Sequence, residues 1–178
     1  MDRLIVVDGY NLILRSPRLR PEPGRSLREA REKLVNLLSW AVGGGDAEFI
    51  VVFDGAEGGG PNERDGRVDV RFSRQPEKAD DEIRRIVEDR IDRVDRLTVV
   101  TADLEVARHA RAMGADIALS DLFLQSVLGP VRSGEAGGQQ AEEEKPTMIS
   151  KKELEEWAQI FRAPRPGEEA KEEDETEH

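Results

Sequence analysis

Residues 4–11 read LIVVDGYN, a short apolar run that ends at an aspartate followed by a glycine. The run at residues 4–8 predicts a strand buried on both faces, as in a parallel sheet. Residues 49–55 (FIVVFDG) and 97–103 (LTVVTAD) repeat this pattern further along the chain. Residues 68–72 alternate apolar and charged side chains, which predicts a half-exposed or edge strand, and residues 116–119 predict another short strand.

Helices are predicted between these strands. After a capping box at Ser26 and Glu29, apolar residues recur at helical spacing up to residue 41. Further helices are expected from about residue 78, over 103–113 and over 121–128, whereas 15–25 and 56–66 are expected to be loops. Strands alternating with helices indicate an α/β fold with three layers, in which helices cover both faces of a central, mostly parallel sheet.

The composition changes after Pro130, and this predicts the domain organisation. Residues 1–130 form the domain, 131–148 a flexible linker, 149–163 a C-terminal helix, and 164–178 a disordered acidic tail. Leu154, Trp157, Ile160 and Phe161 share one face of the C-terminal helix. That face is expected to pack on the domain or on a partner.

Composition and charge exclude several classes of protein. The chain has no cysteine, which excludes disulfides, thiolate zinc sites and cysteine nucleophiles and fits a reducing compartment. No stretch approaches the roughly 20 apolar residues of a membrane helix, so a cytoplasmic protein without a membrane partner is expected. Of the net charge of −11, −8 lies in residues 134–178. The remaining acidity does not exclude a polyanionic substrate.

Familiar nucleotide and hydrolase motifs are missing from the sequence. Gly58-Gly59-Gly60 lacks the Lys-Ser/Thr of a P-loop, and neither GxGxxG nor GxSxG occurs. His109, predicted to lie on a helix surface, and His178 are the only histidines, which leaves no histidine-based site.

Acidic residues instead follow the predicted strands or begin the predicted helices. In parallel sheets such positions converge at the carboxyl edge, and grouped carboxylates attract a hard cation such as Mg²⁺ or Mn²⁺. Each acid also has a simpler interpretation as a turn former or helix cap. These residues are Asp8, Asp54, Asp80, Asp81 and Asp103.

Arginines gather in the two predicted loops and in and after the predicted strand at residues 68–72. Guanidinium groups bind phosphates in bidentate fashion, although surface arginines also serve solubility alone. The candidates for substrate binding are Arg15, Arg18, Arg20, Arg71 and Arg74.

The strings LIVVDGYNLI, VVFDG, KADDEI and VVTADLEVARHARAMGA occur in this order along the chain. Together they resemble the YacP-like branch of the NYN family, in the PIN-like nuclease superfamily. The resemblance covers about residues 3–130, and the helix KKELEEW…FR is similar to the end of that family. It implies a PIN-like fold, hydrolysis of phosphodiesters with a divalent metal, and RNA as the substrate.

The resemblance also implies roles for individual residues. Asp8 would be a metal ligand with Asn11 as its polar companion, and Asp54 an accessory acid. The family's Thr-Ala-Asp becomes Lys78-Ala79-Asp80, with Asp81 as a close substitute for the aligned acid. Its Thr-Ser-Asp becomes Thr101-Ala102-Asp103, so both departures keep the carboxylate.

The leading hypothesis is therefore an endoribonuclease with Asp8, Asp80 and Asp103 as its principal metal ligands. One alternative is a module that binds RNA or the ribosome through a catalytically inactive pocket. A phosphatase of the haloacid dehalogenase type is disfavoured, because it needs Asp-x-Asp where this chain has Asp8-Gly9-Tyr10. Exonucleolytic cleavage and the oligomeric state stay open at this point.

Overall fold

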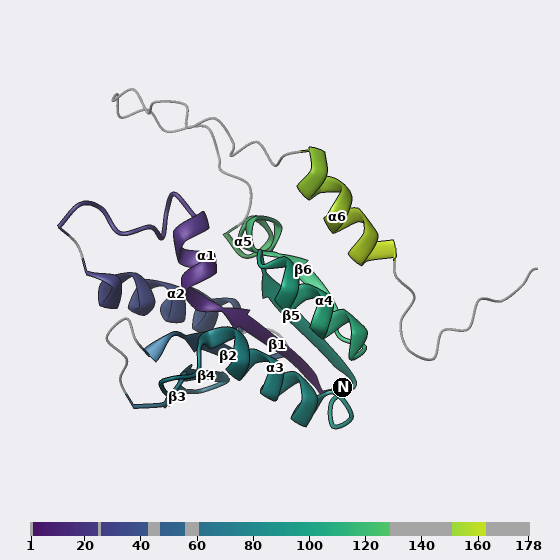
Figure 1. Cartoon of the computed structure of the whole chain (residues 1–178). Helices are drawn as coiled ribbons and strands as arrows, with labels where there is room; N and C mark the ends of the chain where they lie inside the picture. Colours follow the sequence, from purple (N-terminus) through teal and green to yellow (C-terminus); the bar gives the residue numbers. More distant parts are fainter. Residues whose placement is uncertain (1, 25, 43–46, 56–60, 129–150, 163–178) are drawn as a thin grey trace, which may run out of the picture.

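The computed structural model describes residues 2–24, 26–42, 47–55, 61–128 and 151–162 (Figure 1). The strands are β1 (Arg3–Asp8), β2 (Ala47–Phe53), β3 (Glu63–Asp65), β4 (Val68–Phe72), β5 (Arg96–Thr101) and β6 (Asp116–Leu119). The helices are α1 (Gly9–Arg15), α2 (Leu27–Val42), α3 (Ala79–Arg90), α4 (Leu104–Ala112), α5 (Ser120–Leu128) and α6 (Lys151–Arg162).

The six strands form one sheet in the order β3-β4-β2-β1-β5-β6. Every pairing is parallel except β3 with β4, which is antiparallel. The strand that begins at Arg3 lies in the middle of the sheet, between β2 and β5. The predicted α/β class and the mostly parallel sheet are confirmed.

Two apolar layers hold the helices on opposite faces of the sheet. Leu12, Leu34 and Leu124 bring α1, α2 and α5 onto one face, where they pack with Val7 and Val51. On the other face α3 and α4 pack against the alternate residues of the same strands. Because successive side chains of a strand point to opposite faces, one apolar strand supplies both layers.

Three sequence predictions need correction. The residues after Asp8 are helical, because burial of Leu12 and Ile13 stabilises the short helix α1 where only a turn was expected. The expected loop at 56–66 contains β3, while residues 56–60 lie outside the described part of the chain. Of the two alternatives for residues 68–72, the edge strand is wrong because β3 covers it, whereas the half-exposed strand is confirmed, with Val68 and Val70 buried and Asp69 and Arg71 partly exposed.

The C-terminal helix α6 packs on the domain. Ile160 is buried beside Ala107 of α4, so α6 lies against that helix, as Figure 1 shows. The predicted linker at 131–148 and the tail at 164–178 lie outside the described residues. None of the helices that the structure describes is both long and apolar enough to cross a bilayer.

Candidate active site at the carboxyl edge of the sheet

Asp8 is the last residue of the central strand β1 and directly precedes α1. Gly9 permits the chain to pass directly from β1 into α1 beside Phe53, because a Cβ atom at this position would lie 2.3 Å from Cε1 of Phe53. The Asp8 side chain makes no capping hydrogen bond of good geometry to α1. The simple interpretation of Asp8 as a helix cap therefore does not explain this residue.

Thr101 connects Asp8 with the start of α4. Its buried hydroxyl donates to Oδ2 of Asp8 at 3.3 Å and accepts from the backbone N–H of Asp103 at 3.0 Å. A single hydroxyl thus fixes the end of β5 relative to both acids. Thr101 was not among the predicted site residues, although a polar residue ending the apolar run LTVVT was a usable signal.

The electrostatic environment of Asp8 disfavours its ionised form. Burial raises the pKa of Asp8 from 3.8 to about 7, and the nearby carboxylates of Asp103 and Asp80 contribute to this rise. The Thr101 hydroxyl and the backbone N–H of Asn11 oppose it. Three carboxylates from β1, α3 and the start of α4 therefore interact at one edge of the sheet.

Asp103 is both a helix cap and a member of this group. Its Oδ1 accepts hydrogen bonds from the backbone N–H groups of Glu105 at 2.9 Å and Val106 at 3.3 Å. These bonds hold the carboxylate in one orientation and leave Oδ2 without a hydrogen bond among the described residues. An ordinary cap can thus still offer one oxygen to a ligand.

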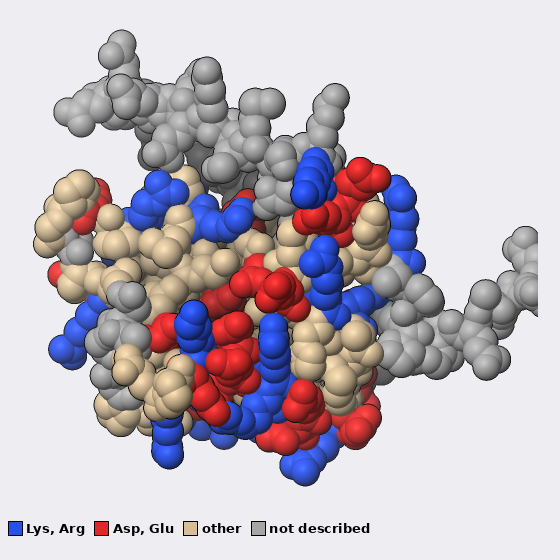
Figure 2. Space-filling view, viewed as in Figure 1, with Lys and Arg blue, Asp and Glu red and all other residues tan. Residues whose placement is uncertain are grey.

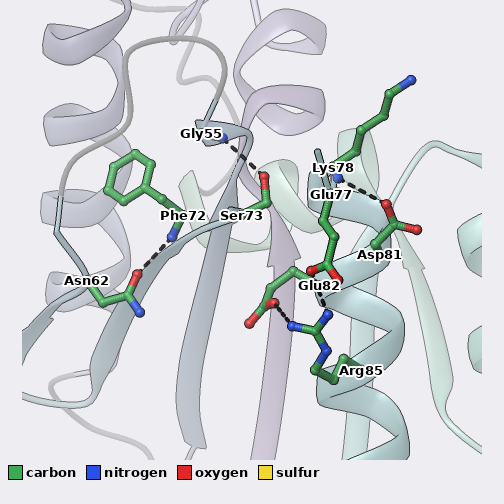
Figure 3. Close-up of polar contacts among 9 residues, drawn as sticks. All are labelled: Gly55, Asn62, Phe72, Ser73, Glu77, Lys78, Asp81, Glu82 and Arg85. Atoms are coloured by element: carbon green, nitrogen blue, oxygen red, sulfur yellow. Dashed lines mark hydrogen bonds and ion pairs between the residues drawn. The ribbon is translucent and has the colours of Figure 1, made fainter. Parts of the chain in front are cut away.

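Asp80 and Asp81 have different environments although they are adjacent. Asp81 accepts a hydrogen bond from the backbone N–H of Lys78 at 3.0 Å, which ties it to the start of α3 (Figure 3). Asp80 is the one that contributes to the raised pKa of Asp8. The carboxylate of Asp80 therefore interacts with Asp8, whereas Asp81 caps the start of α3.

That loop, residues 73–78, is held at both ends. Gly55 donates its backbone N–H to Oγ of Ser73 at 3.1 Å, and Arg85 of α3 binds Glu77 at 2.5 Å (Figure 3). A Cβ atom on Gly55 would lie 2.1 Å from the backbone oxygen of Ser73. The glycine after Asp54 therefore permits close contact between the ends of β2 and β4.

Asn11 does not extend its oxygen toward the carboxylates. Its Oδ1 accepts from the backbone N–H of Ala102 at 2.9 Å and from the Ser120 hydroxyl at 3.1 Å. Asn11 thus joins α1 to the end of β5 and the start of α5. The buried Ser120 was not foreseen from sequence, because its partner is 109 residues away.

The proposed phosphate-binding arginines come from two separate segments of the chain. Arg15, Arg18 and Arg20 lie exposed on and after α1, and Nε of Arg20 donates to the backbone oxygen of Leu14. Arg71 is paired with Asp69 at 3.0 Å, and Arg74 is exposed just beyond β4. No contact among the described residues assigns any of the five to a substrate.

A further arginine, which no sequence pattern singled out, contacts the start of α1. Arg31 of α2 donates to the Tyr10 hydroxyl at 2.7 Å, and its guanidinium lies 5.3 Å from the ring centre of Phe72. The first contact is a hydrogen bond and the second is a cation–π interaction, which commonly fixes an arginine. Arg31 thereby connects α2 to the residues that follow Asp8.

The donor set fits a hard divalent cation in its chemistry. Its members are carboxylates, and burial together with their mutual repulsion disfavours the charged form of Asp8 unless a cation compensates. Among the residues that the structure describes, no three acids or histidines are yet close enough together to hold a metal. Side-chain movements would be needed to bring three ligands together, and Oδ2 of Asp103 has no hydrogen bond among the described residues.

A mostly parallel sheet with an acidic carboxyl edge, covered by helices on both faces, is the arrangement of PIN-like α/β domains. The chain belongs to the YacP-like NYN domain family, whose model matches residues 5–162. NYN domains are of the nuclease type and act on nucleic acids. The matched residues include α6.

Known relatives agree with this assignment. The chain is 29% identical over 102 residues to "Uncharacterized protein YacP" of Bacillus subtilis (strain 168). The aligned residues make up 56% of this chain and 60% of that protein. The chain thus spans less than two thirds of that relative's length. The crystal structure of Rae1 (YacP) from Bacillus subtilis is similar, with a TM-score of 0.62 and 27% identity, over 70% of this chain and 73% of that one. A crystal structure of a mutant of the same protein gives the same TM-score and identity.

Proposed function

We propose that this chain is a divalent-metal-dependent endoribonuclease. The observation that carries the proposal is the group of Asp8, Asp80 and Asp103 at the carboxyl edge of the sheet, where burial and the neighbouring carboxylates raise the pKa of Asp8. Membership of a nuclease-type family supports the same conclusion. The reducing cytoplasm is the compartment that suits a chain without cysteine.

Asp8, Asp80 and the free oxygen of Asp103 would hold Mg²⁺ or Mn²⁺, with Asp54 as an accessory acid. Such a cation, when bound, lowers the pKa of water and polarises a phosphate. Thr101 orients Asp8 through its hydroxyl, and the α4 cap orients Asp103. Asn11 keeps the turn after β5 in place through Ala102. The chain itself therefore contributes charge and preorganisation.

The test is cleavage of an internally labelled, single-stranded RNA with blocked ends, in Mg²⁺ or Mn²⁺ and in excess chelator. We expect cleavage only with metal, and loss of at least about 100-fold in Asp8→Asn, because a ligand is removed while the shape is kept. Asp92→Asn, an exposed acid after α3, is the matched control and should retain wild-type activity. Full activity in chelator or in Asp8→Asn would refute the proposal.

A module that binds RNA or the ribosome without cleaving it is the second candidate. It is favoured by one observation, that no three acids among the described residues lie close enough together to hold a metal as they are. Equal binding of RNA or ribosomes by the wild type and by Asp8→Asn, without turnover in any metal, would establish this candidate instead. Product formation by the wild type alone would exclude it.

A further inference from the structure

Four arginines surround a cavity of about 510 Å³ at the end of the sheet opposite to Asp8. They are Arg3, Arg67, Arg90 and Arg93, here called the distal arginine cluster. They come from the start of β1, the turn between β3 and β4, the end of α3 and the turn after it. The letter N in Figure 1 marks this end of the sheet.

Three members of the cluster differ from most other arginines in lacking partners. Arg3, Arg90 and Arg93 form no ion pair or side-chain hydrogen bond with any described residue. By contrast, Arg85 and Arg96 are each bound to acids. Unpaired like charges around one cavity repel each other, which raises the free energy of the folded protein. A bound anion would remove this repulsion.

The acids at the cavity only partly compensate for the cluster. Glu48 lines the cavity but lies 3.7 Å from Arg64, so its charge is shared with an arginine outside the cluster. Asp2 also lines it, and the nearby Asp95 accepts the backbone N–H of Asp2. The cavity therefore keeps an excess of positive charge although the whole chain carries −11. Figure 2 shows how closely acids and bases are interleaved elsewhere, on the face that it displays.

We propose that the distal arginine cluster binds the phosphate backbone of RNA, as an anchoring site separate from the carboxylate edge. Guanidinium groups from separate segments suit successive phosphates of a strand, which they contact without reading its sequence. The inference rests on the proposed function, because it takes RNA as the polyanion. The two ends of β1 are about 17 Å apart, so only a longer strand could reach both sites.

The experiment measures binding of a 20-nucleotide single-stranded RNA in chelator, where no cleavage interferes. Arg3→Gln/Arg93→Gln removes two exposed arginines of the cluster. We expect roughly tenfold weaker binding at about 0.1 M salt, and a slope of log K against log salt that is smaller by about 1.4. The matched control is Arg108→Gln/Arg162→Gln, which removes two exposed arginines elsewhere and should leave the slope unchanged.

A dinucleotide, which has a single internucleotide phosphate, cannot reach both ends of the sheet. Its binding at the carboxylate edge and its cleavage with metal should be the same in Arg3→Gln/Arg93→Gln and in the wild type. An unchanged slope for the 20-nucleotide RNA, or an equal loss in the control, would overturn the anchoring site. A further outcome is that inorganic phosphate raises the melting temperature of the wild type but not of the cluster variant, while both bind RNA equally. This outcome would show a site for small anions and would also overturn the anchoring site.

Failure of this inference can be separated from failure of the proposed function. The RNA-binding comparison needs no catalysis, whereas the cleavage test uses Asp8→Asn and leaves the cluster intact. Loss of cleavage in every metal would refute the nuclease and leave the binding result valid. Unchanged binding would refute the anchor and leave the nuclease valid.

Discussion

Without a bound cation, Asp8 is neutral in about half of the molecules at pH 7, because its pKa is about 7. The folded pKa lies above the unfolded value of 3.8, so the folded state binds the proton more tightly. Protonation of Asp8 therefore stabilises the folded state. This contribution to the free energy of unfolding is fully present below about pH 4 and is lost as the pH rises through 7. Burial and carboxylate crowding thus make the metal-free protein less stable at neutral pH.

Asp8→Asn should remove this dependence on pH. In chelator we expect the free energy of unfolding of the variant to exceed that of the wild type by about 2–4 kcal/mol at pH 8, and by little at pH 4. Urea titrations of both proteins at several pH values measure the difference between their free energies of unfolding. The contributions of the other titrating groups are the same in both proteins and cancel in this difference. A constant difference from pH 4 to pH 8 would show that Asp8 has an ordinary pKa.

Asn11→Ala should destabilise the fold although the residue carries no charge. The backbone N–H of Ala102 and the Ser120 hydroxyl would both lose their acceptor, which costs about 2–3 kcal/mol. Ser120→Ala removes one donor without stranding the asparagine and should cost about 1 kcal/mol. Denaturant midpoints measure both, and an equal loss in the two variants would contradict this role of Asn11.

At the scale of elements, the two Asp-Gly pairs permit close packing of strand ends. We expect Gly9→Ala to cost about 1–3 kcal/mol, because the Phe53 ring can shift to accept a methyl group. Gly55→Ala should cost more, at least about 3 kcal/mol, since the obstacle is the backbone oxygen of Ser73. Ser73→Ala, which removes only the hydroxyl that Gly55 binds, serves as the control. Equal midpoints of urea unfolding for Gly55→Ala and Ser73→Ala would contradict the steric argument.

The sequence predicts β1, β2 and β5 well because each contains an uninterrupted β-branched run (IVV or TVV), and LIVVD is the clearest of them. It does not predict α1, whose seven residues begin with Gly-Tyr-Asn and become helical only because Leu12 and Ile13 are buried. It also misses β3, whose residues are charged and exposed, so that only the backbone pairing with β4 defines it.

For the site, the sequence places the acids at the correct edge because a parallel sheet gathers its carboxyl ends. It cannot distinguish Asp80 from Asp81, because the difference is the bond from Lys78 that only the folded loop makes. The roles of Asn11 and Thr101 likewise depend on partners about 90 residues away in the chain. No local pattern predicts the partners in such contacts, although the polar residue that ends LTVVT marks Thr101 itself.

At the scale of the whole molecule, the proposed cation should stabilise the fold by mass action. With 10 mM Mg²⁺ and a dissociation constant of about 1 mM, the gain is about 1.4 kcal/mol, which raises the melting temperature by about 3–5 °C. Asp8→Asn should show a much smaller rise. Differential scanning fluorimetry with and without chelator measures this, with Asp92→Asn as the control. Equal rises in the wild type and Asp8→Asn would place the cation elsewhere.

The short strand β3 also decides how the sheet ends. An unpaired strand edge is a template for further strands, including those of other copies of the chain. Here β4, with its buried Val68 and Val70, is closed by three exposed residues that are all charged, Glu63, Arg64 and Asp65. Another copy that paired with β3 would have to place its own strand against these charges. This segment therefore protects the protein from aggregation at that edge, so its polarity matters even though it lies far from the acids at the end of β1.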